Sequence, residues 1–576
     1  MITLTIDNQT VTVKAGSTIL EAAQKVGINI PTLCYLKDIN VVGACRICVV
    51  EVQGARTLIP ACVAPADDEM VVFTSTPAVI KARKFVLELI LSDHPMECLS
   101  CIRNENCELQ KLASEFCVTE IRYEGVKTSH TIDDSSPAIV RDPRKCILCR
   151  RCISVCGNIQ TVNALTADNK GFNAVIAPAF NERLANMECI QCGQCSLVCP
   201  TGAIQEKNDI DKVWAALANP KKHVIVQTAP ATRVQIGEIM GAEPGSIVTG
   251  QMVAGLRRLG FDKVFDTNFS ADVTIMEEST ELLQRVAKGG ILPMMTSCSP
   301  GWIKFIEHFY PDLLPHLSTC KSPQQMFGAL AKTYYAQKAD IDPADIVSVS
   351  VMPCTAKKFE CIRPEMFSSG YQDVDVVLTT RELGRMFKQA RFNFSKLPEE
   401  EYDAPLGIAT GAGQIFGASG GVMEAALRTV YEVVTGKKLK NINFAACRGL
   451  DGVKEATLQV GKLPLKVVIV NALGNARIVL DRIRAGEADY DFIEVMCCPG
   501  GCIGGGGGPI PTSAEIRLKR IDATYTEDAG MVLRKSHDNP AVKELYAEFL
   551  ENPLSSKSQE LLHTHYTPRS EYPKCD

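Results

Sequence analysis

The sequence predicts a multidomain α+β protein, with three small N-terminal domains built around metal clusters and one large, two-lobed α/β domain behind them. Its 576 residues correspond to about four domains of roughly 150 residues each. Of its 25 cysteines, 16 fall before residue 200, in tight local spacings. From about residue 210 onward, apolar runs rich in β-formers alternate with amphipathic helical patterns, which is typical of α/β architecture.

Charge and hydropathy exclude several classes of function. Lys plus Arg number 61 against 66 for Asp plus Glu, so the net charge is −5 and the basic excess of a nucleic-acid-binding protein is missing. No apolar run approaches the ~18 residues that span a bilayer, and the first residues alternate in polarity like a strand rather than a signal peptide. We therefore expect a cytoplasmic protein without nucleic-acid or membrane partners. Its grouped thiols should stay reduced and bind metal.

Residues 1–77 carry a cysteine pattern that predicts a 2Fe–2S site. A helix is expected over Ser17–Val26, with Ser17 as its N-cap. The cysteines that follow are spaced C-x10-C-x2-C with a remote fourth, a variant of the plant-type pattern C-x4-C-x2-C. Zinc is the alternative, but zinc sites more often show two C-x-x-C knuckles. We expect a β-grasp, ferredoxin-like domain with the ligands Cys34, Cys45, Cys48 and Cys62.

Residues 78–130 combine one histidine with three cysteines. After a helix predicted over Ala78–Ser92, the ligand-type residues follow the spacing H-x3-C-x2-C-x5-C. This set suits either a Cys3His zinc site or a 4Fe–4S cluster with one histidine ligand, and the local pattern leaves both open. Cys117 falls outside the spacing and is expected to pack in the interior. The candidate ligands are His94, Cys98, Cys101 and Cys107.

Residues 138–208 contain the run C-x2-C-x2-C-x3-C twice, the second time followed by proline. This is the pattern of two-cluster bacterial ferredoxins, in which the fourth cysteine of each run ligates the other cluster. One 4Fe–4S cluster is therefore assigned Cys146, Cys149, Cys152 and Cys199. The second is assigned Cys189, Cys192, Cys195 and Cys156. Cluster motifs in series predict an electron-transfer chain, and this context favours iron over zinc at His94.

Residues 210–515 lack the nucleotide-binding motifs that α/β domains often carry. The glycines from Gly411 to Gly417 are spaced unlike a dinucleotide fingerprint and are expected to form a loop. The run Gly504–Gly508 lacks the Lys-Ser/Thr of a P-loop. The informative segments are three loops that pair cysteine with proline or glycine, at residues 296–302, 352–360 and 494–502.

These loops read TSCSPGW, MPCTAKKFE and EVMCCPGGC, and they resemble the signature loops of iron-only (FeFe) hydrogenases. The resemblance extends over the whole chain, because the N-terminal cluster motifs match the long clostridial-type monomeric enzymes in order and spacing. Residues 516–576 resemble the separate small subunit of some relatives. The resemblance implies a two-lobed catalytic α/β domain that holds an H-cluster. This is a 4Fe–4S cluster joined through a cysteine sulfur to a two-iron site with CO, cyanide and azadithiolate ligands.

The resemblance also implies roles for individual residues around the H-cluster. Cys502 would bridge the two parts of the cluster, Cys354 and Cys498 would ligate its 4Fe–4S part, and Lys357 would donate to a cyanide. The expected lining of the two-iron site comprises Ala229, Pro230, Gln324, Met352, Phe416, Val422 and Met496. Such an apolar lining would hold diatomic ligands while a cation offsets the charge of cyanide.

The family's proton route maps onto Cys298, Glu278, Ser318, Glu281 and Arg285. Glu278 and Glu281 lie three residues apart, on one face of a helix expected to begin near Met276. Burial would raise the pKa of such a carboxyl group towards neutrality, which suits proton relay. The alternative interpretation is a solvated helix face.

The first and third loops depart from the family pattern. The usual first loop reads TSCCP, but Ser299 stands where its second cysteine ligates the cluster, and Cys497 is an additional thiol in the third loop. We expect Cys497 to supply the missing ligand while Cys298 relays protons. Two alternatives stay open: Ser299 ligates through oxygen, or Cys298 becomes the ligand and Cys497 the relay. Ala231 stands where some relatives carry serine.

The expected function is a hydrogenase that reversibly reduces protons to H2. Electrons from reduced ferredoxin or flavodoxin would pass through one 2Fe–2S and three accessory 4Fe–4S clusters to the H-cluster. Separate maturation proteins would build the two-iron site. The alternatives are a non-catalytic gas or redox sensor, a cluster-assembly factor, and an electron-transfer subunit, the last of which leaves residues after 210 without a role. Sensors often carry an added signalling domain, and this chain ends at Asp576 without one, which disfavours the sensor.

Overall fold

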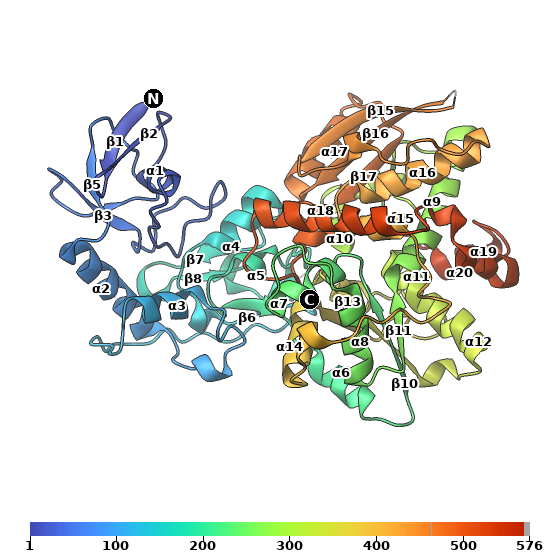
Figure 1. Ribbon diagram of the computed structural model, residues 1–576, viewed down its shortest axis with the longest axis horizontal. Helices are drawn as coiled ribbons and strands as arrows, with labels where there is room; N and C mark the ends of the chain where they lie inside the picture. The colour runs from blue at the N-terminus through green and yellow to red at the C-terminus, as the bar shows by residue number, and fades with distance from the viewer. Residues whose placement is uncertain (462, 570–576) are drawn as a thin grey trace.

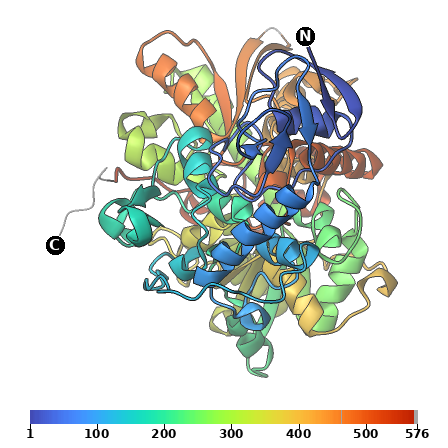
Figure 2. The same ribbon diagram turned by 90° about the vertical axis from the view of Figure 1, so that its left-hand side faces the viewer.

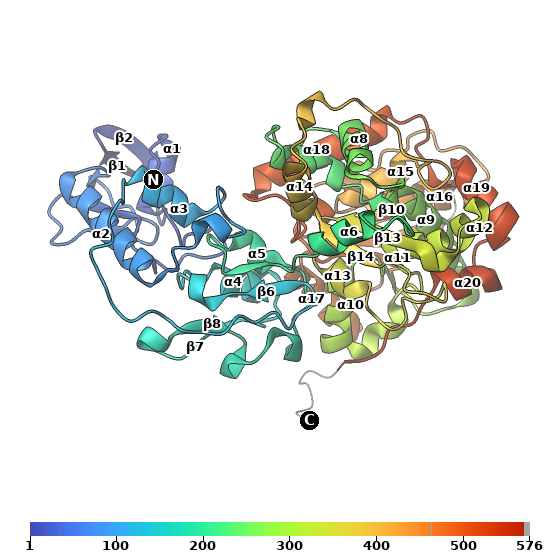
Figure 3. The ribbon, with the colours of Figure 1, turned by 90° about the horizontal axis from the view of Figure 1, so that it is seen from below.

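A computed structural model describes residues 1–461 and 463–569 of the chain (Figure 1). The N-terminal 200 residues form an arm of small domains beside a larger body, as the view from below also shows (Figure 3). Seen end-on, the arm lies in front of the body (Figure 2). Residues 570–576 of the C-terminal segment expected over 516–576 lie outside the described residues. Within the described ranges, no helix combines the length and apolar character needed to cross a bilayer.

The first domain is a five-stranded sheet with one helix. Its strands are β1 (Ile2–Ile6), β2 (Gln9–Val13), β3 (Val49–Val52), β4 (Ile59–Pro60) and β5 (Val71–Phe73), in the order β2-β1-β5-β3-β4. Helix α1 (Ile19–Lys25) is capped by Thr18, so the expected N-cap at Ser17 was wrong. Thr18 has Glu21 three residues on and forms a capping box with it, whereas Ser17 is followed at that spacing by Leu20.

Two helices organise the next domain. Helix α2 (Pro77–Asp93) matches the predicted helix over Ala78–Ser92, and α3 (Glu108–Glu115) follows the histidine–cysteine segment. Cys117 is exposed, so its expected packing role was wrong. It adopts a positive φ of 49° just after α3 ends, and this turn directs the residue to the surface.

The third domain has the pseudo-symmetric layout of its duplicated sequence. Its elements are β6 (Ile139–Arg141), α4 (Arg151–Ser154), β7 (Thr166–Asp168), β8 (Val175–Ala177), α5 (Gln194–Val198) and β9 (Ile204–Glu206). Strands β6 and β9 pair antiparallel, as do β7 and β8, and α4 packs against α5. The domain lies between the N-terminal sheet and the larger body (Figure 3).

The larger body contains two four-stranded sheets. The first is parallel throughout, in the order β11-β10-β13-β14: β10 (His223–Thr228), β11 (Lys263–Asp266), β13 (Ile346–Met352) and β14 (Val376–Thr379). The second has the order β12-β17-β16-β15: β12 (Met294–Met295), β15 (Val453–Val460), β16 (Leu463–Asn471) and β17 (Phe492–Met496). The three cysteine loops follow β12, β13 and β17 directly. Since these strands are parallel to their sheet neighbours, their carboxyl ends carry the loops, where α/β proteins commonly bind ligands.

Helices surround these two sheets. They are α6 (Ile210–Leu217), α7 (Ile236–Ile239), α8 (Thr249–Leu259), α9 (Thr267–Lys288), α10 (Pro300–Phe309), α11 (Pro323–Leu330), α12 (Ala336–Ala339), α13 (Ala356–Glu360), α14 (Thr380–Gln389), α15 (Gly411–Gln414), α16 (Gly421–Thr435) and α17 (Leu473–Arg484). Helix α9 begins at Thr267 rather than near Met276. Asp266 caps its first turn by accepting from Asn268 N, so the helix starts directly after β11.

The glycines at residues 411–417 form short helical turns, including α15, so the expected loop was wrong. A Cβ atom added at Gly413 would lie 2.5 Å from Asn268 O. Glycine is therefore needed for close packing of α15 on α9.

The C-terminal segment wraps back over the body with α18 (Ala514–Gly530), α19 (Pro540–Leu545) and α20 (Ser556–Leu562), seen in red in Figure 1. Its last described part runs beside residues 319–321, where Lys321 N donates to Leu562 O at 2.8 Å and Thr564 N donates to Thr319 O at 2.8 Å. The segment thus reaches the inner face of the body, close to α9.

Candidate metal-cluster sites

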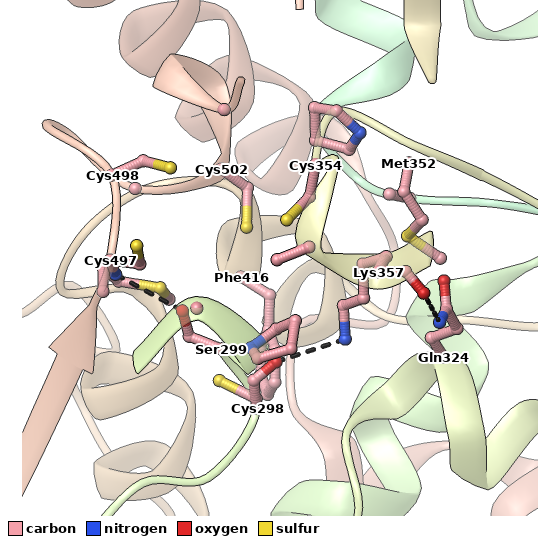
Figure 4. Close-up of a pocket in the computed structure, with 18 of the residues that line it drawn as sticks. Cys298, Ser299, Gln324, Met352, Cys354, Lys357, Phe416, Cys497, Cys498 and Cys502 are labelled. Carbon is pink, nitrogen blue, oxygen red and sulfur yellow. Dashed lines mark hydrogen bonds between the residues drawn. The ribbon is translucent and has the colours of Figure 1, made fainter. Parts of the chain in front are cut away.

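A cavity lies where the three cysteine loops meet (Figure 4). Its wall is mostly apolar, with Met352, Phe416 and Met496 among the lining residues. Ala229, Pro230 and Gln324 also line it. Val422 does not; it is buried in the hydrophobic core together with Phe416 and Met496. Of the residues expected around the two-iron site, the structure therefore brings all but Val422 to the cavity wall.

Six thiols border this cavity. They belong to Cys192, Cys298, Cys354, Cys497, Cys498 and Cys502. In Figure 4 the thiols of Cys354, Cys498 and Cys502 converge on one end of the cavity, whereas that of Cys298 points away from them. Burial raises the pKa of Cys502 to about 12, so this thiol would lose its proton only to a bound metal. The donor set therefore suits a soft metal cluster.

The loops that carry these thiols pack backbone against backbone. A Cβ atom at Gly505 would lie 2.2 Å from Pro353 O, and one at Gly501 would lie 2.6 Å from Ser419 N. Gly501 also has a φ of 93°, which favours glycine. The glycine-rich third loop thus brings Cys498 and Cys502 close to Cys354, because no side chain intervenes.

Ser299 and Cys497 occupy one corner of the cavity. Cys497 N donates to Ser299 Oγ at 3.3 Å, and the thiol of Cys497 lies within hydrogen-bond distance of those of Cys192 and Cys498. A Cβ atom at Gly301 would approach Cys497 Sγ to 2.8 Å, so glycine leaves room for this sulfur. Cys497 O accepts from Gln160 Nε2 at 3.0 Å, which ties the corner to the third domain.

The cavity contains a positioned cation. Lys357 Nζ donates to Cys298 O at 3.2 Å and to Glu360 Oε2 at 3.0 Å. Glu360 Oε2 also accepts from Gln324 Nε2 at 3.0 Å. Sequence reasoning assigned no role to Glu360, although its spacing three residues after Lys357 on a helix was a usable signal. The ammonium group is therefore fixed at the wall rather than free to turn outward.

A chain of polar groups leads from the cavity along α9. Glu278 is buried, and within the described residues neither of its carboxyl oxygens has a hydrogen-bond partner. Burial and the nearby Glu281 carboxylate raise the pKa of Glu278 to about 8. Glu281 accepts from Ser318 Oγ at 3.0 Å and from Arg285 Nη2 at 2.6 Å. The structure thus gathers the residues predicted for proton transfer, with a buried acid that is neutral at physiological pH.

The accessory cysteines fall into separate groups. The thiols of the first group, Cys34, Cys45, Cys48 and Cys62, are buried, and Cys62 lies within hydrogen-bond distance of Cys34 and Cys48. One small cavity is lined by Cys146, Cys149, Cys152 and Cys199. Another is lined by Cys156, Cys189, Cys192 and Cys195. The grouping crosses between the two sequence runs in the way the pattern predicts. Cys192 borders both this last cavity and the large one, so the accessory site adjoins the main site.

His94 lines a fourth cavity together with Cys98, Cys101 and Cys107. Its Nδ1 atom is buried and has no hydrogen-bond partner within the described residues. Burial and the nearby Lys145 lower the pKa of His94 to about 4, so the ring is neutral. A neutral imidazole with an unpaired, buried nitrogen fits a metal ligand.

Comparison with known protein families agrees with this arrangement. Residues 222–506 match the family described as iron only hydrogenase large subunit, C-terminal domain, and residues 514–569 match iron hydrogenase small subunit. Residues 1–77 match a 2Fe-2S iron-sulfur cluster binding domain, and residues 132–203 match a 4Fe-4S dicluster domain. Residues 83–122 match the iron-sulfur binding region of NADH-ubiquinone oxidoreductase-G.

Individual relatives extend the similarity to the whole chain. The NADP-reducing hydrogenase subunit HndD of Solidesulfovibrio fructosivorans is 54% identical over 99% of both chains. Iron hydrogenase 1 of Clostridium pasteurianum is 40% identical over 96% of this chain and 97% of its own. A solved structure of a variant of the apo FeFe hydrogenase HydA1 from Chlamydomonas reinhardtii covers 63% of this chain and 99% of its own, with 45% identity and a TM-score of 0.57.

Proposed function

This chain belongs to the iron-only (FeFe) hydrogenase family, and from that premise we propose that it catalyses the reversible reduction of protons to H2 with electrons from ferredoxin or flavodoxin. The membership itself rests on the family matches and on relatives that are similar over the full length. One observation supports the proposal most directly. The thiol-lined cavity shares Cys192 with an accessory cluster site, and its Cys298 lies near the buried acid Glu278. The predicted electron-transfer chain and the predicted proton route therefore both end at this cavity.

The residues around the large cavity fit an H-cluster. When bound, this cluster supplies the iron at which protons and electrons combine. Cys354, Cys498 and Cys502 offer thiolates for it, and the apolar wall excludes water from diatomic ligands. Lys357 offers a cation, held by Glu360, that would offset an anionic ligand such as cyanide. Pro230 and Met352, which line the cavity, would allow only small molecules to reach the cluster.

We propose that Cys497 supplies the fourth ligand of the 4Fe–4S part. Its thiol lies beside that of Cys498, and its backbone is next to Ser299, the position that lacks the usual cysteine. Ser299 Oγ already accepts a hydrogen bond from Cys497 N, and iron in such clusters prefers sulfur to a hydroxyl oxygen. Cys298 is disfavoured as the ligand, because its thiol points away from the other three in Figure 4. It would instead pass protons between Glu278 and the cluster.

We propose one 2Fe–2S and three accessory 4Fe–4S clusters in the arm, held by the four groups of residues described above. The orphaned Nδ1 of His94 supports a ligand role for that residue. Electrons would enter through the 2Fe–2S or the His94 site. They would leave through the cluster bordered by Cys192, because this cavity adjoins the large one. We also propose a cytoplasmic location and assembly of the two-iron site by separate maturation proteins.

A second candidate for the electron partner comes from one relative. The protein that is 54% identical is named as a subunit of an NADP-reducing hydrogenase. This chain would then exchange electrons with a partner subunit that reacts with NADP, and ferredoxin would be an alternative donor. Both proposed electron partners would serve the same catalytic site. They differ only in what exchanges electrons with the N-terminal clusters.

Infrared spectroscopy tests the proposed function directly. Anaerobically matured protein should show bands of iron-bound CO and cyanide that shift when H2 is admitted. Absence of these bands, with accessory clusters intact and a related hydrogenase matured in parallel, would refute the hydrogenase assignment. H2 production should then be assayed with reduced ferredoxin and, separately, with NADPH. Activity of the purified chain with ferredoxin alone supports the first partner, whereas activity only after addition of an NADP-reactive subunit supports the second.

A further inference from the structure

The C-terminal segment places a histidine beside the predicted proton route. Backbone hydrogen bonds on both sides of His563 hold residues 562–564 against residues 319–321. The imidazole therefore has a fixed position, facing Thr319 and α9. Its side chain is 7% exposed, and both of its ring nitrogens have hydrogen-bond partners inside the protein.

Three hydrogen bonds connect two glutamates of α9 through this histidine. Thr319 Oγ1 lies 3.2 Å from Glu281 Oε2 and 2.8 Å from His563 Nδ1. His563 Nε2 lies 3.1 Å from Glu277 Oε2. Each step is short enough for proton transfer between the heavy atoms. The series runs from the predicted proton route to His563, whose side chain is 7% exposed, and on to the buried Glu277.

The surroundings of Glu277 determine which nitrogen of His563 carries a proton. Glu277 is fully buried and accepts hydrogen bonds from Tyr546 OH at 2.6 Å, Ser558 Oγ at 2.5 Å and Leu554 N at 2.8 Å. All three of these contacts use the carboxyl oxygens of Glu277 as acceptors, so the His563 ring can face it with an N–H donor. When His563 Nε2 donates to Glu277, Nδ1 can accept from the Thr319 hydroxyl; that hydroxyl donates to Glu281 Oε2 while Glu281 is ionised.

Arg285 cannot perform the same transfer. Its guanidinium group donates to Glu281 Oε1 and to the backbone oxygens of Ile291, Pro315, His316 and Leu317. A guanidinium group does not release a proton in proteins. Arg285 thus holds Glu281 in place, and a proton that leaves Glu281 along protein groups needs a different acceptor.

We propose that Thr319 and His563 form a proton outlet from Glu281, which rests on the hydrogenase function proposed above. When Glu281 holds a proton on Oε2, this proton passes to Thr319 Oγ1 while the Thr319 hydroxyl proton passes to His563 Nδ1. The products are a Glu281 carboxylate, a restored Thr319 hydroxyl and a His563 imidazolium facing the Glu277 carboxylate. No electrons move, and the same steps run backwards when protons are taken up.

The other titratable group that faces His563 does not compete for the proton. Cys320, from the adjoining segment, lies near both His563 and Glu281. Burial raises the pKa of its thiol well above the usual value, so it stays neutral. Tyr546 is reached only through Glu277, and burial raises the pKa of its phenol as well. The imidazole nitrogen Nδ1 is therefore the proton acceptor that the Thr319 hydroxyl faces in this cluster.

Variants of the relay test the proposal in the matured holoenzyme. Thr319→Val removes the bridging hydroxyl at nearly constant volume and should lower H2 production about tenfold. Thr319→Ser should recover most of that loss. His563→Ala should lower the rate similarly, and added imidazole should restore it in a pH-dependent way, but should not restore Thr319→Val. The matched control is His565→Ala, which removes an exposed histidine two residues away and should leave the rate unchanged.

Infrared difference spectra provide a readout that does not depend on turnover. With the relay cut in Thr319→Val, Glu281 should retain its proton longer, so the band of a protonated carboxyl group should grow on admission of H2. Glu281→Gln in the same background should abolish the gain. The proposal is overturned if Thr319→Val keeps the wild-type rate and pH profile, or if imidazole fails to restore His563→Ala. A wild-type protein without CO and cyanide bands would refute the proposed function instead.

Discussion

Ser299 Oγ lies 3.3 Å from Cys497 N, so the position that lacks a thiol in this chain and the position that gained one are neighbours in space. Their separation in the sequence is 198 residues, and they come from the loops that follow β12 and β17, neighbouring parallel strands of the second sheet. Gly301 leaves room for the added sulfur, since a Cβ atom there would approach Cys497 Sγ to 2.8 Å. The two departures from the family pattern therefore meet at one corner of the cavity.

Cys497→Ala should remove a ligand of the H-cluster's 4Fe–4S part. We expect its EPR signal to be lost or altered and H2 production to fall by at least about a hundredfold, because an incomplete cluster cannot hold the two-iron site. Adding Ser299→Cys to this variant should restore the signal, since the thiol returns to the family's usual position. Cys117→Ala, at an exposed cysteine, is the control. An unchanged EPR signal in Cys497→Ala would leave Cys298 or Ser299 as the ligand.

Glu278→Gln should stop proton transfer while leaving the clusters intact. The glutamine amide has nearly the same shape as the carboxyl group but cannot take up and release a proton. Glu278 can do so near neutral pH, because its pKa is about 8. We expect turnover to fall by about 10² to 10⁴, as for loss of a general acid. Infrared and EPR spectra should match those of the wild type. Glu560→Gln, at an exposed position on α20, is the control, and an active Glu278→Gln variant would exclude Glu278 from the route.

The same substitution should change how stability depends on pH. Because burial raises the pKa of Glu278 from 4.5 to about 8, the folded protein binds this proton more tightly than the unfolded chain does. The contribution of the protonated Glu278 to the free energy of unfolding is fully present below pH 4.5. It is lost as the pH rises through 8, at up to about 1.4 kcal/mol per pH unit. The Glu278→Gln variant does not lose stability in this way, because its amide does not titrate. Its thermal midpoint should therefore rise relative to wild type between pH 6 and pH 8, and a constant difference would contradict the raised pKa.

Local sequence signals anticipated which cysteines of the third domain line a common cavity, but not the contacts made across the fold. Spacing alone grouped Cys156 with Cys189, because the crossed ligation of duplicated runs is a property of the pattern. The helix start at Thr18 required noticing Glu21, a local signal that was present in the sequence. By contrast, Thr319 and His563 are 244 residues apart, and no periodicity relates them. Their contact exists only because the C-terminal segment folds back onto the body.

Lys304 shows the same limit at the junction between the arm and the body. It lies on α10, one turn after Gly301. Gly301 packs against the third domain, since a Cβ atom added there would lie 3.5 Å from Ile190 O. The side chain is buried, with Nζ 4.7 Å from the centre of the Phe359 ring. Burial lowers the pKa of Lys304 to about 8, and the charge of Cys189 opposes that shift. The ammonium group thus lies near a predicted ligand of the accessory cluster that adjoins the large cavity.

Lys304→Met should lower the reduction potential of that accessory cluster. A nearby positive charge stabilises the reduced, more negative cluster, so its removal disfavours reduction. At an effective dielectric constant of about 20, the expected shift is on the order of 50–100 mV. Redox titration followed by EPR measures it on the purified holoenzyme. Lys304→Arg keeps the charge and should stay close to the wild-type potential. If both variants shift the potential equally, packing rather than charge is responsible, and Lys304 has no electrostatic part in delivering electrons to the H-cluster.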